Sequence, residues 1–215
     1  MSGATASRVQ AVETHDVLVI GSGVGGLTVA LETPGLRVGL LTKTELGRGG
    51  SSPMAQGGVA VAIGPGDSPA AHAEDTLAAA AGLAVPERVR ILTEEGPARI
   101  AALLALGTRF DRDGAGHLAL GREAAHGCAR ILHANGDATG AEIVRALREA
   151  VESAPTVAVL ERTFACELVR EQGRVVGVLA RHAAGTVVLH LARAVVLATG
   201  GIGQVYRYTT NPREN

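Results

Sequence analysis

The first pattern whose residue types and spacing indicate a binding function is a glycine-rich turn near the N-terminus, Gly21-x-Gly23-x-x-Gly26. It lies between an apolar, β-branched run at 16–20 and residues 27–31, which have helical character. The first glycine permits a tight turn, the second lets the backbone approach a pyrophosphate, and the third lets helix and strand pack closely. The positive end of the helix dipole then attracts phosphate. The turn therefore predicts a dinucleotide site.

The pair Thr42-Lys43 departs from the usual dinucleotide pattern. It stands at the end of a strand expected at 37–41, where an acidic side chain normally binds a ribose hydroxyl. The absence of an acidic side chain at this position disfavours a generic NAD site. A lysine suits a 2′-phosphate instead, so an NADP-binding module remains an alternative.

A second pattern, at 49–58, combines glycines, hydroxyl groups and one amide in a single loop. Backbone N–H groups freed by small residues can line the edge of a planar heterocycle, and the Gln56 side chain can both donate and accept a hydrogen bond. The alternative is an ordinary flexible surface loop.

Three histidines, His117, His126 and His133, raise the question of a metal site. Their spacings of nine and seven residues do not make them helical neighbours, and no cluster of cysteines or carboxylates completes a ligand shell. We therefore expect no metal there. Hydrogen bonds from His133 and Asp137 are expected to hold their loop together.

The elements that position these motifs begin with a strand–helix–strand unit over 16–41. Further helices and strands follow, the strands between 157 and 191 forming a β-meander. The expected helices are 71–81, 86–93, 97–106 and 141–151, and the later strands are 157–160, 164–170, 174–180, 186–191 and 193–201. Residues 1–15 are predicted to be a mobile leader and 16–215 a single domain.

Composition excludes several functions. Twenty Lys and Arg against 21 Asp and Glu leave no basic excess for a nucleic-acid backbone, and 2% aromatic residues cannot build a base-stacking surface. No apolar run reaches the ~18 residues of a membrane-spanning helix. Two cysteines make no disulfide framework, and with no signal peptide a reducing, cytoplasmic location fits.

Five sequence blocks resemble a known family. They are DVLVIGSGVGGL, LLTKTELGRGGSSPMAQGGVA, HAEDTLAAAAGL, GREAAHGCARILHANGDATG and LATGGIGQVYRYTTNP. In this order, from residue 16 to 213, they are similar to the flavoprotein family of succinate dehydrogenase and fumarate reductase, above all to its branch that oxidises L-aspartate. The resemblance implies an α/β, Rossmann-like FAD-binding domain with a parallel sheet and an inserted β-meander, truncated before the family's capping domain.

The resemblance also implies which residues bind FAD. Lysine is frequent in this family at the position of Lys43, which accounts for the missing acid. The implied contacts are Gly21, Ser22, Gly23, Val24, Gly25, Gly26, Lys43, Ser51, Ser52, Pro53, Met54, Ala55, Gln56, Gly57, Gly58, Thr199 and Gly200.

The residue type at the position of Ser51 distinguishes branches of that family. Its respiratory succinate dehydrogenases attach the flavin covalently through a histidine five residues before the glutamine of the AQGG block, where this chain has Ser51. A serine cannot form that histidyl link. The resemblance therefore implies non-covalent FAD.

Glu123 is the substrate residue that the resemblance implies. A carboxylate near the flavin suits the α-ammonium group of aspartate and repels a dicarboxylate without nitrogen. Alternatively, Glu123 forms a solvated ion pair with Arg122 or Arg130. Ala124 and Ala125 replace glycines of the family pattern, which could narrow this loop.

The implied reaction is oxidation of L-aspartate to iminoaspartate, with oxygen or fumarate as electron acceptor. The product would feed quinolinate and NAD synthesis, with quinolinate synthase as a possible partner protein. Two alternatives stay open, a soluble fumarate reductase or related flavin dehydrogenase, and a fragment that only binds FAD. The family's catalytic arginine lies beyond residue 215, so we expect no catalytic residue in this chain and no turnover by the chain alone.

Overall fold

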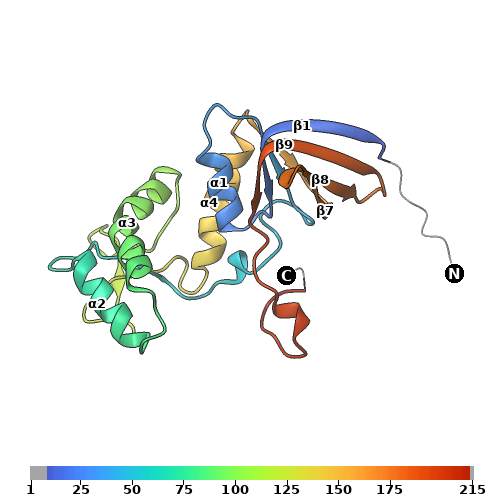
Figure 1. Cartoon of the computed structure of the whole chain (residues 1–215). Helices are drawn as coiled ribbons and strands as arrows, with labels where there is room; N and C mark the ends of the chain where they lie inside the picture. The colour runs from blue at the N-terminus through green and yellow to red at the C-terminus, as the bar shows by residue number, and fades with distance from the viewer. Residues whose placement is uncertain (1–8, 214–215) are drawn as a thin grey trace. The chain divides into compact units, whose positions relative to one another are not determined.

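The computed structural model describes residues 9–213, which divide into two compact units (Figure 1). The described part of the first unit is 9–53 with 147–213, and the second unit is 54–146. Most of the predicted leader, residues 1–8, lies outside the described residues.

A six-stranded sheet, in the order β6-β2-β1-β9-β8-β7, forms the first unit. Strands β6, β2, β1 and β9 are parallel, whereas β9, β8 and β7 pair antiparallel. The predicted combination of parallel sheet and meander is thus confirmed. The strands are β1 (Ala11–Ile20), β2 (Val38–Leu41), β6 (Val157–Leu160), β7 (Thr163–Glu171), β8 (Arg174–His182) and β9 (Val187–Leu197).

The helix α1 (Val24–Leu31) connects β1 to β2 and packs against both strands (Figure 1). Its Leu27 and Ala30 are buried, as are the last four residues of β1 and all of β2. These continuous apolar strands are typical of a parallel sheet covered on its faces. Burial of this apolar surface fixes the glycine turn between a rigid strand and a rigid helix.

The strands differ from the sequence prediction in three places. β1 begins at Ala11, so residues 11–15 are not leader but pair with β9 from Val188 onward. The two strands predicted at 186–191 and 193–201 are one continuous strand, β9, and its first half pairs with residues 11–15. The strand at 157–160 belongs to the parallel part beside β2, which leaves three strands in the meander.

The second unit contains two helices and a small sheet of order β3-β5-β4. The helix α2 (Pro69–Ala79) begins after Ser68, whose hydroxyl accepts a hydrogen bond from the N–H of Ala71. The remaining elements are α3 (Pro86–Ala105), β3 (Val59–Ala60), β4 (Leu120–Gly121) and β5 (Ile131–Leu132). This small sheet was not predicted, because two-residue strands show no alternating pattern.

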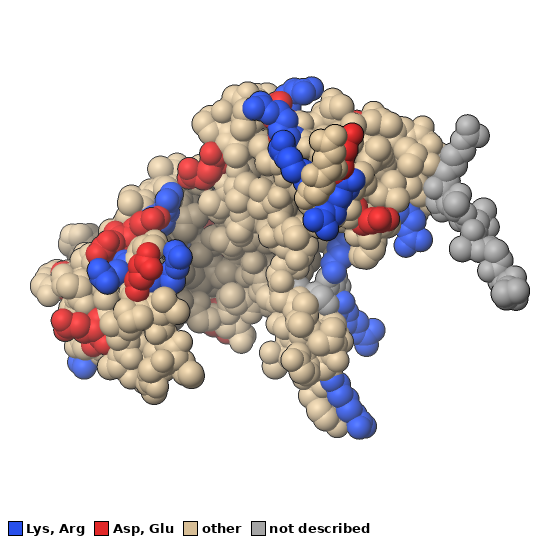
Figure 2. Space-filling model, in the orientation of Figure 1, with Lys and Arg blue, Asp and Glu red and all other residues tan. Residues whose placement is uncertain are grey.

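One continuous helix, α3, replaces the two predicted at 86–93 and 97–106. Pro97 lies inside it, where its missing N–H removes one hydrogen bond of the helix. Acidic and basic side chains are interspersed over this part of the surface (Figure 2). Arg99 and Glu95 on α3 form an ion pair at 2.8 Å.

The helix α4 (Thr139–Glu152) contains the boundary between the units, which falls at Leu147. Two short 3-10 helices, Ser52–Met54 and Gly203–Val205, complete the described elements. No helix within residues 9–213 is long and apolar enough to cross a membrane.

Candidate cofactor site

A cleft of about 380 Å³ opens in the first unit where the parallel strands end. The glycine turn, the end of β2 and the segment after β9 all contribute, as expected where neighbouring parallel strands meet their connections. Eight predicted contacts line it, namely Gly21, Ser22, Gly23, Lys43, Ser51, Ser52, Thr199 and Gly200. The cleft thus brings together residues that lie up to 181 positions apart in the sequence, from Ile20 to Gly201.

The three glycines of the motif have different structural roles. A Cβ atom on Gly21 would collide with the carbonyl oxygen of Ala198, and a Cβ atom on Gly26 would collide with the carbonyl oxygen of Gly21. These two glycines therefore allow β1, β9 and α1 to approach one another. Gly23 has an ordinary φ of −73°, and a Cβ atom there would lie 3.1 Å from the Ser52 hydroxyl oxygen, at the cleft.

The N-terminus of α1 has no capping side chain of its own. Gly23 is its N-cap residue and offers no side-chain cap, and the first turn contains no acidic residue. The Ser52 hydroxyl accepts a hydrogen bond from the N–H of Val24 at 3.2 Å. An anion bound at this helix end would be stabilised by N–H groups and by the helix dipole.

Hydroxyl groups tie the glycine turn to the end of β2. Ser22 donates a hydrogen bond to the Thr42 hydroxyl at 2.8 Å, and both residues are buried. The backbone N–H of Thr163 donates to the Thr42 carbonyl, also at 2.8 Å, so the start of β7 closes this side of the cleft. Lys43 is the one charged residue among the described residues that line the cleft, so its charge favours an anionic ligand.

Other lining residues were not among the predicted contacts. The loop 44–50 adds Thr44, together with Gly49 and Gly50, which belong to the glycine-rich pattern recognised in the sequence at 49–58. The segment 163–165 had no local signal, since only the order of strands in the sheet brings β7 to this place. The remaining lining residues are Ile20, Leu41, Thr42, Ala198 and Gly201.

Nine predicted cofactor contacts do not line the cleft. Val24, Gly25 and Gly26 belong to α1, where Gly26 is buried against the turn, and Pro53 lies in the short helix Ser52–Met54. The other five fall in the second unit and are Met54, Ala55, Gln56, Gly57 and Gly58.

Within the second unit, His133 lies between Gly58 and Glu123. Its Nε2 is 3.4 Å from a carboxylate oxygen of Glu123, and a Cβ atom on Gly58 would lie 2.9 Å from its Cε1. The end of the AQGG loop and the predicted substrate residue are thus neighbours. The pairing of β5 with both β3 and β4 positions the two, because Val59 and Leu120 are each opposite Leu132.

Arg130 is not the partner of Glu123. Its side chain is 1% exposed and donates to both carboxylate oxygens of Asp67, at 2.8 and 2.9 Å, and to Asp75 at 2.8 Å. Arg122 instead donates to the carbonyl of His126. The two ion pairs considered from the sequence are therefore absent among the described residues, and the Glu123 side chain is exposed beside His133.

The charged groups around Arg130 stabilise one another electrostatically. Burial raises the pKa of the Asp67 carboxyl, but hydrogen bonds from Arg130, Cys128 and the Ser68 N–H outweigh burial and leave the pKa below its ordinary value. The N–H of Gly127 lowers the pKa of Asp75, and Arg130 lowers it further. This cluster fixes the loop 126–130, which follows Glu123 in the sequence.

The profile of the family described as "FAD binding domain" matches residues 16–215. The chain belongs to this family. FAD is accordingly the cofactor of the domain, and the cleft fits it, because a glycine-lined helix N-terminus and one lysine are what a pyrophosphate requires. The alternative NADP-binding module is not supported.

Relatives of this FAD-binding domain include proteins named L-aspartate oxidase. The protein from Streptomyces coelicolor is 50% identical over 206 residues, covering 92% of this chain and 35% of its own length. The protein from Synechocystis is 47% identical over 201 residues, covering 92% and 36%. The chain thus spans about a third of the length of the curated relatives it matches.

Solved structures share the fold of the FAD-binding domain. Mycobacterium smegmatis Sdh1, solved in complex with UQ1, superimposes with a TM-score of 0.88 at 32% identity, over 95% of this chain and 37% of that one. The FrdA subunit of E. coli quinol fumarate reductase gives 0.89 at 28% identity, over 95% and 36%. The predicted membership of the succinate dehydrogenase and fumarate reductase flavoprotein family is confirmed.

Proposed function

We propose that this chain is the FAD-binding part of a flavin-dependent enzyme that oxidises L-aspartate to iminoaspartate. The observation that carries the proposal is the 50% identity to the Streptomyces coelicolor L-aspartate oxidase over 92% of this chain. Because the chain spans about a third of that protein, substrate and turnover belong to the complete protein. The residues 9–213 supply the cofactor site and one face of the substrate site.

The cleft holds the phosphates in this proposal. The N–H groups at the start of α1 and the ammonium group of Lys43 neutralise the pyrophosphate, while Gly23 leaves room for it. Thr199 and Gly200 also line the cleft. When bound, the flavin supplies a two-electron acceptor for the hydride from the α-carbon of aspartate.

Glu123 recognises the substrate ammonium group in this proposal. Its carboxylate is exposed and, among residues 9–213, pairs with His133. Glu123 lies in the same unit as the AQGG loop. Because Arg122 and Arg130 contact other groups, this exposed carboxylate is accessible to a cationic ligand. The complete protein has to supply the groups that bind the two substrate carboxylates.

The proposal also includes the electron acceptor, the enzyme that uses the product, and the cellular location. Oxygen or fumarate takes up the electrons, and iminoaspartate passes toward quinolinate and NAD, with quinolinate synthase as the next enzyme. The location is the cytoplasm, which agrees with two free cysteines.

Non-covalent FAD follows from Ser51, whose hydroxyl donates to the Asn211 side chain at 3.2 Å. Neither side chain is an imidazole that could carry a histidyl–flavin bond. After denaturation and ultrafiltration, we expect the flavin spectrum in the filtrate. A yellow precipitate over a colourless filtrate would contradict this part of the proposal.

Peroxide release tests the proposed reaction. The complete protein that contains this sequence should form hydrogen peroxide with L-aspartate and not with D-aspartate or succinate. Fumarate reduction without aspartate oxidation would favour the second candidate, a soluble fumarate reductase, which the likeness to FrdA supports.

Flavin bleaching tests the isolated chain. Loaded with FAD under anaerobic conditions, residues 1–215 should not bleach on addition of L-aspartate, because a substrate must be fixed over the flavin and shielded from water. Rapid bleaching by L-aspartate and not by D-aspartate would show that the catalytic residues lie within this chain.

A further inference from the structure

A cluster of two histidines and a glutamate lies on β1 and β9, and its β1 members fall in the segment predicted from the sequence to be a leader. Glu13 and His15 are two residues apart on β1, and His190 on β9 is the register partner of Glu13. Neighbouring parallel strands therefore place the three side chains on the same face of the sheet.

The three nearest polar atoms form a compact triangle. His15 Nε2 and His190 Nδ1 are 3.3 Å apart, and a Glu13 carboxylate oxygen is 3.4 Å from His190 Nδ1 and 3.9 Å from His15 Nε2. Zinc bonds of about 2.0–2.1 Å in a tetrahedral site place ligand atoms about 3.3–3.4 Å apart. Two sides of the triangle match this spacing.

We propose that Glu13, His15 and His190 bind a zinc ion that joins β1 to β9. Three protein ligands leave a fourth position for water. The ligand set of two imidazoles and one carboxylate suits a transition metal rather than Ca²⁺ or Mg²⁺, which prefer oxygen ligands. Zinc has no geometric preference from its d-electrons, so it tolerates the longer third side.

The triangle is buried on its histidine side and open to solvent on its glutamate side. The side chain of His190 is 0% exposed and that of His15 is 8% exposed. Glu13 is 46% exposed, which gives an ion a path from solvent.

Buried nitrogens near the triangle also call for an explanation. His190 Nε2 and His182 Nε2 have no hydrogen-bond partner among residues 9–213, although both are buried. The rings of these two histidines lie beside each other, with centroids 6.0 Å apart. Native proteins rarely leave such groups unpaired, and an ordered water is a common partner; the proposed zinc binds His190 through Nδ1 and occupies neither of these Nε2 atoms.

Zinc binding to the purified, tag-free protein tests the proposal. After treatment with a chelator, the protein is titrated with ZnCl₂ in competition with a chromophoric chelator, and we expect one tight site per chain. Glu13→Gln and His15→Gln should each weaken binding by about 100-fold or more, since even residues outside the ligand shell are worth about 10–100-fold. Circular dichroism shows whether each variant keeps its fold.

The matched control is His117→Gln. His117 faces Asp113 at 3.5 Å in an exposed histidine–carboxylate pair, so it reports ordinary surface binding of zinc. Its affinity should equal that of the unaltered protein. If Glu13→Gln and His15→Gln, both folded, bind zinc as tightly as this control, the proposal is wrong.

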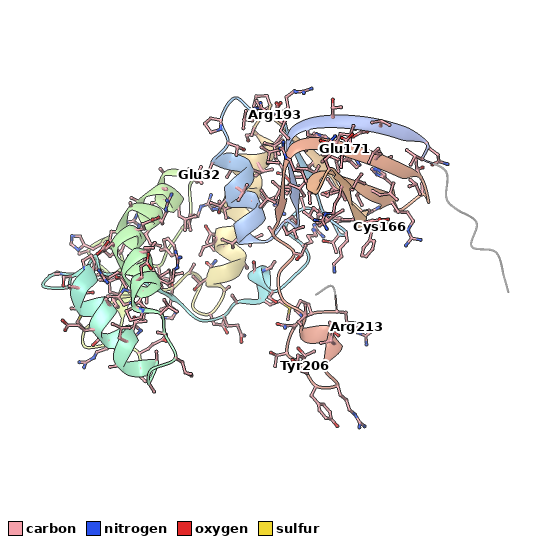
Figure 3. All side chains as sticks on the ribbon, viewed as in Figure 1. Glu32, Cys166, Glu171, Arg193, Tyr206 and Arg213 are labelled. Atoms are coloured by element: carbon pink, nitrogen blue, oxygen red, sulfur yellow. The ribbon has the colours of Figure 1, made fainter. Side chains whose placement is uncertain are left out.

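Cobalt substitution identifies the ligands independently. Co²⁺ in this site should give the intense visible bands of tetrahedral coordination, without the near-ultraviolet band of a thiolate. The exposed free thiol of Cys166 on β7 (Figure 3) is the competing ligand that such a band would reveal. A thiolate band, or the weak bands of six-coordinate cobalt, would overturn the assignment.

Discussion

The hydroxyl oxygen of Ser52 accepts a hydrogen bond from the backbone N–H of Val24 at 3.2 Å. A Cβ atom on Gly23 would lie 3.1 Å from that same oxygen. The loop after β2 and the start of α1 are therefore in direct contact at the place where the cofactor phosphates are proposed to bind. Any side chain at Gly23 competes for that space.

The first prediction concerns Gly23. Gly23→Ala should weaken FAD binding by at least about tenfold, or 1.4 kcal/mol, and Gly23→Val should abolish retention of FAD, because the side chain fills the space between backbone and phosphate. Fluorescence titration of the apoprotein with FAD measures both. Gly114→Ala is the control, since Gly114 has open space around its Cβ position and an ordinary φ. Unchanged FAD affinity in Gly23→Val would refute the assignment.

The second prediction separates Gly26 from Gly23. Gly26→Ala should lower the free energy of unfolding by about 1–3 kcal/mol even without FAD, because its Cβ atom would collide with the Gly21 carbonyl oxygen. Gly23→Ala should cost the apoprotein far less, since its φ is ordinary. Urea unfolding of the two apoproteins makes the comparison. Equal losses would contradict the division of roles among the motif glycines.

The third prediction concerns Glu123 in the complete protein. Glu123→Gln should reduce kcat/KM for aspartate by about 10- to 150-fold, or roughly 1.5–3 kcal/mol, because a charge-assisted contact with the ammonium group is lost. Fumarate reduction should change little, since fumarate has no ammonium group. Glu94→Gln, on α3, controls for the loss of an exposed carboxylate. Equal losses with both substrates would remove Glu123 from ammonium recognition.

The fourth prediction is a pH dependence of stability set by Asp67. Its pKa in the folded protein lies below its ordinary value, so the native state binds fewer protons than the unfolded state near pH 4. The resulting stabilisation is present above about pH 4 and is lost as the pH falls through the folded-state pKa.

Thermal melts between pH 3 and 7 measure this dependence. Asp67→Asn should destabilise the protein by about 3–5 kcal/mol at pH 7, because it leaves the buried Arg130 without its main partner. The same variant should flatten the acid limb of the stability profile. Asp137→Asn, at an exposed loop position, is the control. An acid limb of unchanged slope in Asp67→Asn would exclude this cluster as its source.

The sequence by itself determined the strand–turn–helix–strand unit and its glycine turn. The signals are local: an apolar run, a glycine spacing and a helical period occupy fewer than thirty consecutive residues, and short-range geometry alone links them to a phosphate site. Local reasoning also associated Lys43 with a phosphate, whereas Ser51 and Thr199 were expected only from the family resemblance; all three line the cleft.

Only the tertiary structure decided which distant segments meet. Hydrogen bonding of the long strand β9 to β1 made a strand of residues 11–15, brought His190 beside Glu13, and placed Ala198 against Gly21. No sequence pattern encodes those contacts, because strand pairing joins residues more than 170 positions apart, and the register depends on the whole sheet. The different roles of Gly21 and Gly23 follow from that same pairing.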